Sequence, residues 1–159
     1  MDQLASELQV SWKKQFQWLE AKTKLENEEV FLVKPQTWMN LSGEAVAKIV
    51  GHTKSSLENL IVVHDELDLD LGVLRWVFES GHGGHNGVRS IIDQLSTKAF
   101  NRLRLGVGRP PKGSDPADYV LNPFSRAETE AAKKLTIDAT ESIRAFLKHG
   151  LQWVQNHYH

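Results

Sequence analysis

The chain contains no cysteine among its 159 residues. This absence excludes disulfide bonds, cysteine-ligated metal sites and cysteine nucleophiles. The sequence also lacks any apolar run near the 18 or so residues that a membrane span needs. Its first ten residues alternate polar and apolar side chains, which is not typical of a signal peptide. We therefore expect a soluble, cytoplasmic protein that makes no membrane contact.

A strong net charge is absent as well, since the formal charge is −1. The charge is nevertheless unevenly distributed along the chain. Between Arg75 and Lys112 seven basic and two acidic residues give a local balance of +5, while the remainder sums to −6. A basic segment of this kind can mark a polyanion-binding surface, or it can simply be an uneven solvated surface. Charge alone leaves both interpretations open.

The length and composition fit one globular domain, which we expect to cover residues 1–159. Of these residues 40% are hydrophobic and 25% are charged, and we find no internal repeat. Glycines and prolines concentrate in residues 106–116, which indicates a loop within that domain. Apolar periodicity predicts helices at residues 1–8, 41–50, 88–95, 126–148 and 151–157, and strands at residues 14–24, 29–34, 60–64, 73–78 and 102–107.

Helices that alternate with strands predict an α/β fold, with helices flanking the sheet. The neighbouring strands 14–24 and 29–34 favour a twisted mixed sheet over a purely parallel one. Asn40 is placed to cap the helix at 41–50, and Gly51 is placed to end it. Arginine alternates with leucine at positions 102–105, which predicts a strand with one basic face.

Three polar clusters stand at the ends of predicted elements, where α/β folds usually place their sites. They are residues 37–43 (TWMNLSG), 64–68 (HDELD) and 81–87 (GHGGHNG). The third cluster has four glycines, which would let a ligand approach the backbone just before a helix whose N-terminus attracts anions. It could equally be a tight turn in which Asn86 only caps the helix.

Asp65 directly follows two valines and a histidine, so we expect it to emerge half-buried at the end of a strand. A carboxylate there could hold an imidazole in one tautomer and support it as a base, although an acidic turn would look the same. His82 and His85 could join Asp65 at a metal ion, as in a metal-dependent phosphohydrolase. Their spacing does not match a helical histidine pair, and no third histidine accompanies them. We therefore predict no metal.

Together with residues 102–110 (RLRLGVGRP), the three clusters closely resemble the bacterial-type peptidyl-tRNA hydrolases in both order and spacing. The resemblance runs from about residue 1 to residue 124, and more loosely through the C-terminal helices. It implies a compact, monomeric α/β protein, a phosphorylase/hydrolase-like sandwich without cofactor or metal. It also implies hydrolysis of the ester that joins a peptide to the 3′ end of tRNA. The substrate would be bound through its acceptor end and its peptide.

The resemblance also implies roles for particular residues. Asp65 would hold the water-activating histidine in its basic form, while Asn40 and Asn86 would bind substrate and position the water. These roles suit ester hydrolysis, which needs an activated water and donors for the developing oxyanion. Five further side chains would bind substrate or tRNA: Trp38, Met39, His85, Arg75 and Arg104.

The sequence departs from the family pattern in two places. The family opens with a strand, a glycine-rich turn and an Arg-His-Asn-like motif that carries the catalytic histidine, whereas here the first residues already match the helix that follows. We therefore expect the N-terminal strand and the catalytic histidine to be missing from these 159 residues. In addition, Val77 replaces the second of two lysines that clamp the tRNA 5′ phosphate, and Glu79 adds a negative charge. An alternative to the enzyme is a non-catalytic RNA-binding relative of the same fold.

Overall fold

The computed structural model describes residues 1–158. The chain falls into two compact units. Unit 1 comprises Met1–Ile61 and Phe78–Asn101, and unit 2 comprises Val62–Val77 and Arg102–His159. The expectation that residues 1–159 form a single domain stays a prediction. No helix within residues 1–158 is long and apolar enough to cross a membrane.

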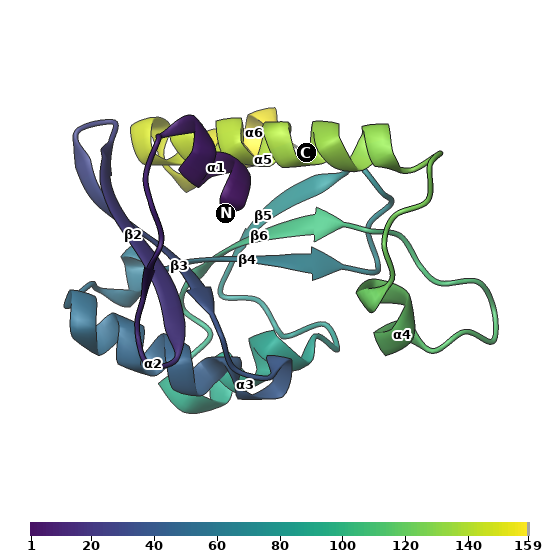
Figure 1. Cartoon of the computed structure of the whole chain (residues 1–159), viewed down its shortest axis with the longest axis horizontal. Coiled ribbons are helices and arrows are strands. Elements are labelled where there is room, and N and C mark those ends of the chain that lie inside the picture. The colour runs from purple at the N-terminus through teal and green to yellow at the C-terminus, as the bar shows by residue number, and fades with distance from the viewer. Residues whose placement is uncertain (159) are drawn as a thin grey trace. The chain divides into compact units, whose positions relative to one another are not determined.

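Unit 1 combines an antiparallel sheet with helices (Figure 1). Its elements are α1 (Asp2–Glu7), β1 (Lys13–Lys14), β2 (Trp18–Leu25), β3 (Glu28–Pro35), η1 (Met39–Leu41), α2 (Ser42–Thr53), η2 (Leu57–Asn59) and α3 (Asn86–Leu95). The strand order is β1-β2-β3. Glu26 and Asn27 join β2 to β3 and both have positive φ, at 50° and 68°. Two such residues make the turn whose twist suits a two-residue hairpin.

The helices at 1–8 and 88–95 and the strand at 29–34 are confirmed, whereas the strand at 14–24 is interrupted. Lys14 pairs with Leu19 across an antiparallel ladder, so the chain must reverse between them. The backbone N–H of Gln15 donates to the carbonyl of Trp18 at 2.8 Å and closes this turn. No glycine or proline within residues 14–24 marks this reversal in the sequence.

Both residues predicted to bound the helix at 41–50 are wrong, although it begins within one residue of the predicted start. Asn40 lies inside the 3-10 turn η1, and Leu41 occupies the N-cap position of α2 without a side-chain cap. Gly51 lies within α2, which continues to Thr53 and ends where Lys54 adopts the left-handed conformation, with φ at 54°. A glycine favours a helix end but does not impose one, because its cost inside a helix is only about 0.5–1 kcal/mol.

The interior of unit 1 lies where α2 packs on the sheet and on α3. Trp18 from β2 packs against Ala45 and Ile49 from α2. The two helices approach closely at Gly43, where an added Cβ would lie only 2.1 Å from the Ser90 carbonyl oxygen. The Gly43 N–H donates to Ser90 Oγ at 2.9 Å. Glycine is therefore needed at this helix crossing for space, and the hydrogen bond fixes its register.

Unit 2 contains a second sheet with strand order β4-β6-β5. Its elements are β4 (Ile61–Glu66), β5 (Leu74–Phe78), β6 (Asn101–Gly106), α4 (Pro116–Leu121), α5 (Thr129–His149) and α6 (Leu151–His157), with the boundary residues 61, 78 and 101 counted in unit 1. The Val107 N–H donates to the Glu66 carbonyl, so β6 ends beside the end of β4 and the two run parallel (Figure 1). The Gly106 N–H donates to the Val73 carbonyl, so β6 ends where β5 begins and these two run antiparallel. The predicted mixed α/β fold is confirmed.

Helix α5 covers this second sheet, as the amphipathic pattern at 126–148 predicts (Figure 1). The Trp76 ring of β5 stacks on Phe146 of α5, with centroids 4.8 Å apart and planes 7° from parallel. Helix α6 has the predicted bounds, and Gln155 donates from it to the Trp76 carbonyl at 3.2 Å. The predicted loop at 106–116 leads into the short helix α4.

Candidate functional site

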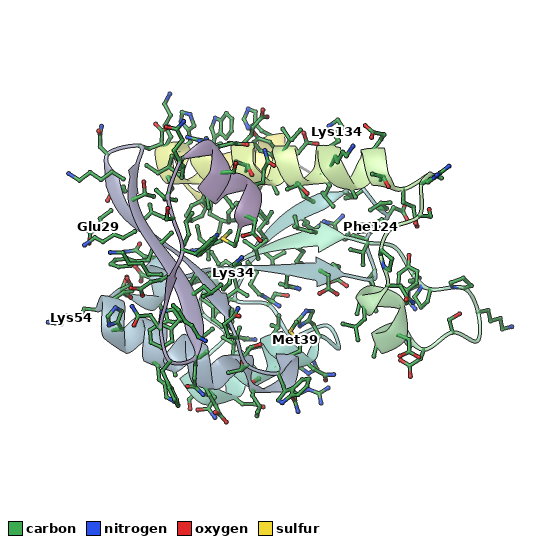
Figure 2. The ribbon with its side chains drawn as sticks, viewed as in Figure 1. Glu29, Lys34, Met39, Lys54, Phe124 and Lys134 are labelled. Atoms are coloured by element: carbon green, nitrogen blue, oxygen red, sulfur yellow. The ribbon has the colours of Figure 1, made fainter. Side chains whose placement is uncertain are left out.

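The two clusters at 37–43 and 81–87 come together in unit 1. Figure 2 shows the Met39 side chain beside the N-terminal end of α3. A Cβ added to Gly87 would lie 2.6 Å from Met39 Sδ and 3.0 Å from His85 Cε1. The thioether therefore occupies space that only a glycine leaves open. Trp38, at 80% exposure, and Met39, at 58%, stand at the surface here.

Two asparagines adjoin this contact in the chain. Asn40 follows Met39 in η1 and Asn86 precedes Gly87 as the first residue of α3, and both are exposed. Asn86 does not cap α3, which contradicts that alternative for the glycine-rich cluster. The cap is His85, whose Nδ1 accepts the Val88 N–H at 3.2 Å. The Asn86 amide therefore stands at a helix N-terminus without serving the helix as its cap.

The two histidines of the 81–87 cluster accept hydrogen bonds from nearby backbone N–H groups. His82 Nδ1 accepts the Gly84 N–H at 3.0 Å, and His85 Nδ1 accepts that of Val88. Each neutral ring therefore carries its proton on Nε2, and neither Nδ1 is available as a metal ligand. Among residues 1–158 no three His, Asp or Glu side chains converge on a possible metal position. Nothing in this geometry favours the metal-dependent phosphohydrolase.

In unit 2 Asp65 lies within β4 and is half-buried. The strand was predicted to end at His64, but it continues to Glu66 because the parallel ladder with β6 extends that far. His64 Nδ1 lies 2.7 Å from the Asp65 carbonyl oxygen. Asp65 is therefore held on a strand, and the acidic-turn interpretation is wrong.

Next to Asp65, Glu66 forms a buried ion pair with Arg104 of β6. Arg104 Nε donates to Glu66 Oε2 at 2.7 Å, and Nη2 lies 2.5 Å from the same oxygen. Glu66 Oε1 accepts the Asp68 N–H at 3.0 Å. The side chains of Arg104 and Glu66 are only 20% and 6% exposed. Glu66 thus fixes the guanidinium to which the resemblance gives a tRNA-binding role, and sequence reasoning did not single it out.

The strand at 102–107 carries its arginines at alternate positions, as predicted, but they are largely buried. Arg102 is 1% exposed, and its pKa is lowered mainly because burial penalises the charged form. Nearby Arg104 lowers the Arg102 pKa further, while Glu66 partly offsets both effects. The cations that do reach solvent in unit 2 include Arg75 on β5 and Arg109, which pairs with Asp68 at 2.6 Å.

A surface hollow in unit 1 was also missed from the sequence. It has a volume of about 570 Å³ and is lined by Phe16, Gln17, Gln36, Thr37, Trp38, Leu41 and Glu44. Phe16 lies in the turn between β1 and β2 and is 89% exposed. A phenylalanine between two glutamines in a polar stretch is the one sequence signal that could have identified it.

Comparison with known proteins agrees with the sequence motifs. The family model described as peptidyl-tRNA hydrolase matches residues 1–159. A peptidyl-tRNA hydrolase of Rhodococcus erythropolis is 46% identical over 136 residues, which are 86% of this chain and 72% of the relative. The chloroplastic peptidyl-tRNA hydrolase of Arabidopsis thaliana is 49% identical over 125 residues, covering 78% of this chain and 43% of the relative.

A solved structure is similar as well. The crystal structure of peptidyl-tRNA hydrolase from Acinetobacter baumannii superposes with a TM-score of 0.90 at 29% sequence identity. The superposition covers 98% of this chain and 80% of that one. Sequence and fold agree, and the chain belongs to the peptidyl-tRNA hydrolase family.

Proposed function

We propose that this chain hydrolyses the ester bond between peptide and tRNA in peptidyl-tRNA and so releases tRNA for reuse in translation. It acts as a cytoplasmic monomer, without cofactor or metal. The observation that carries the proposal is the packing of Met39 on Gly87. Asn40 directly follows Met39 and Asn86 directly precedes Gly87, so this contact joins the two segments that carry the exposed asparagines.

Ester hydrolysis develops negative charge on the carbonyl oxygen, so the site needs fixed donors. The Asn40 and Asn86 amides provide N–H groups, and the N-terminus of α3 adds a positive dipole end. His85 supports this arrangement by capping α3 through its Nδ1. Removing one such donor typically lowers kcat by about 10²–10³.

Asp65 acts in the proposal by holding the imidazole of the general base in its basic tautomer. Its place on a hydrogen-bonded strand suits this role, because a rigid carboxylate fixes the ring orientation. We propose that the base itself comes from the family's Arg-His-Asn-like motif, which is not among residues 1–159. The Nδ1 atoms of His82 and His85 already accept backbone N–H groups, which makes either ring a poor substitute.

We further propose that Arg75 and Arg104 bind the phosphates of tRNA. Arg104 presents a guanidinium already oriented by Glu66, while Arg75 is exposed to solvent. Val77 stands two residues after Arg75, where the family often has a second lysine, so phosphate binding relies on fewer cations. Replacing either arginine with an uncharged residue should therefore make tRNA binding less sensitive to salt, because fewer counterions are released on binding.

The test is hydrolysis of an N-blocked aminoacyl-tRNA by residues 1–159, beside the same chain preceded by the family's N-terminal segment. We expect activity only in the longer chain. Within the longer chain, Asp65→Asn should lower the rate by on the order of 10²–10⁴, while the matched surface variant Asp70→Asn should leave it unchanged. Activity of the 159 residues alone would show that an internal histidine serves as the base.

Inactivity of both chains would overturn the proposed function. Inactivity accompanied by salt-dependent tRNA binding would instead support the non-catalytic RNA-binding alternative. These outcomes are separable, because binding and hydrolysis are measured on the same tRNA.

A further inference from the structure

The hollow beside η1 exposes two large aromatic rings to solvent. Phe16 is 89% exposed and Trp38 is 80% exposed, whereas Trp18, Trp76 and Phe100 are at most 8% exposed. Both exposed rings line the same hollow. Large apolar side chains gathered at one exposed hollow are a candidate site of interaction.

The polar groups around the rings indicate what the hollow would bind. Gln17 Oε1 accepts from Lys48 Nζ, and this ammonium lies 5.8 Å from the centroid of the Phe16 ring. Gln36 Nε2 donates to the carbonyls of Lys34 and Pro35, which leaves its Oε1 as an acceptor. Amide oxygens suit the exocyclic amino groups of bases, and an ammonium suits a backbone phosphate.

The hollow contains little that would select an aliphatic side chain. Leu41 is its single aliphatic hydrophobic lining residue, and the remaining lining is aromatic or polar. Flat rings combined with a cation are the arrangement that binds single-stranded nucleic acid, because every base offers a face for stacking. Glu44 also lines the hollow and would repel phosphate, so the phosphates would lie on the Lys48 side.

We propose that Phe16 and Trp38 form a stacking platform for the unpaired bases at the acceptor end of the tRNA. This inference rests on the proposed function and extends its binding site beyond Asn40 to the β1–β2 turn. Trp38, which lines the hollow, immediately precedes Met39 and Asn40 in the chain. Phe16 then holds the single-stranded acceptor end of the tRNA that leads to the scissile ester. Its role is in substrate binding and not in the chemical step.

The test measures binding of a short single-stranded RNA with the sequence of a tRNA 3′ end, by fluorescence anisotropy at low salt. Three variants of the full chain separate stacking from simple apolar contact: Phe16→Tyr, Phe16→Leu and Phe16→Ala. Stacking on an aromatic side chain is worth about 1–3 kcal/mol per base, which corresponds to roughly 5- to 150-fold in affinity. We expect the Leu and Ala variants to lose affinity within that range, and the Tyr variant to stay within about twofold of wild type.

Phe124→Leu provides the matched control, since Phe124 is 47% exposed, lies in unit 2 and is not part of the hollow. It should bind RNA like wild type. Because Phe16 is almost fully exposed, all its variants should fold, which thermal unfolding would check. Wild-type affinity in the Leu variant, or no binding of the oligonucleotide by the wild type, would overturn the stacking proposal.

Hydrolysis by the chain with the family's N-terminal segment separates this inference from the proposed function. If both hold, Phe16→Ala raises KM for N-blocked aminoacyl-tRNA and leaves kcat nearly unchanged. If the chain hydrolyses the substrate but Phe16→Ala leaves KM unchanged, the stacking proposal is refuted and the proposed function is retained. If RNA binding depends on Phe16 but no hydrolysis is detected, the proposed function is refuted and the stacking proposal is retained.

Discussion

The ion pair between Glu66 and Arg104 makes a sharp prediction about stability. Glu66→Gln keeps the shape of the side chain but removes the charge that two guanidinium groups face. Arg104 contacts Glu66 directly, and buried Arg102 also gains from its charge. Loss of one member of a buried pair typically costs about 3–5 kcal/mol. For a chain of this size that corresponds to a fall in Tm of roughly 6–20 °C.

The reverse variant should cost less. Arg104→Met leaves Glu66 facing Arg102, and it removes a like charge that lowers the Arg102 pKa. We therefore expect Arg104→Met to be clearly less destabilising than Glu66→Gln in urea unfolding at pH 7. The matched control is Glu29→Gln, which breaks an ion pair with Lys22 in which both side chains are more than half exposed. Such pairs contribute about 0–1 kcal/mol. An Arg104 variant that is as unstable as the Glu66 variant would refute this reasoning.

Further predictions concern unit 1. Gly43→Ala should destabilise the chain by about 1–3 kcal/mol or more, because the new methyl would lie 2.1 Å from the Ser90 carbonyl oxygen. Gly51→Ala in the same helix meets nothing within 4 Å and should raise stability by about 0.4–1 kcal/mol in the same urea titration. The pKa of Glu20 is lowered chiefly by the hydrogen bond from Trp18 Nε1. Because its pKa is lowered in the folded state, ionised Glu20 stabilises the fold at pH values above the ordinary 4.5, and this stabilisation is lost as the pH falls through the folded pKa. Glu20→Gln should therefore lower Tm at pH 7, and its effect should shrink below pH 4.5. An effect of Glu20→Gln that grows in acid would contradict this assignment.

Local pattern was enough to predict the last two helices, although it gave no helix at Pro116–Leu121. The apolar spacing at 126–148 and 151–157 corresponds to α5 and α6, because a helix that buries one face needs that period wherever the face packs. The alternation at 102–107 likewise predicted β6. The four motifs at 37–43, 64–68, 81–87 and 102–110 together identified the family, which the comparisons confirm.

The ends of elements were less predictable. Asn40 and Gly51 have the residue types of helix ends, yet α2 begins and ends elsewhere, because packing on α3 and the sheet outweighs a capping preference of about 1 kcal/mol. His85 caps α3 in place of Asn86 through a side chain that residue statistics would not favour. Tertiary contacts contribute more free energy than these local capping preferences and therefore decide where the helices end.

By itself, the sequence determined the fold class, the family and the residue types that the site would need, since periodicity and motif spacing are properties of the chain. Tertiary structure alone decided which of these residues meet. The partner of Arg104 lies 38 positions away at Glu66. The space that Gly87 leaves is filled by Met39, and the exposed aromatic rings of Phe16 and Trp38 share one hollow. Contacts between distant segments depend on how the elements pack, and no local pattern records that packing.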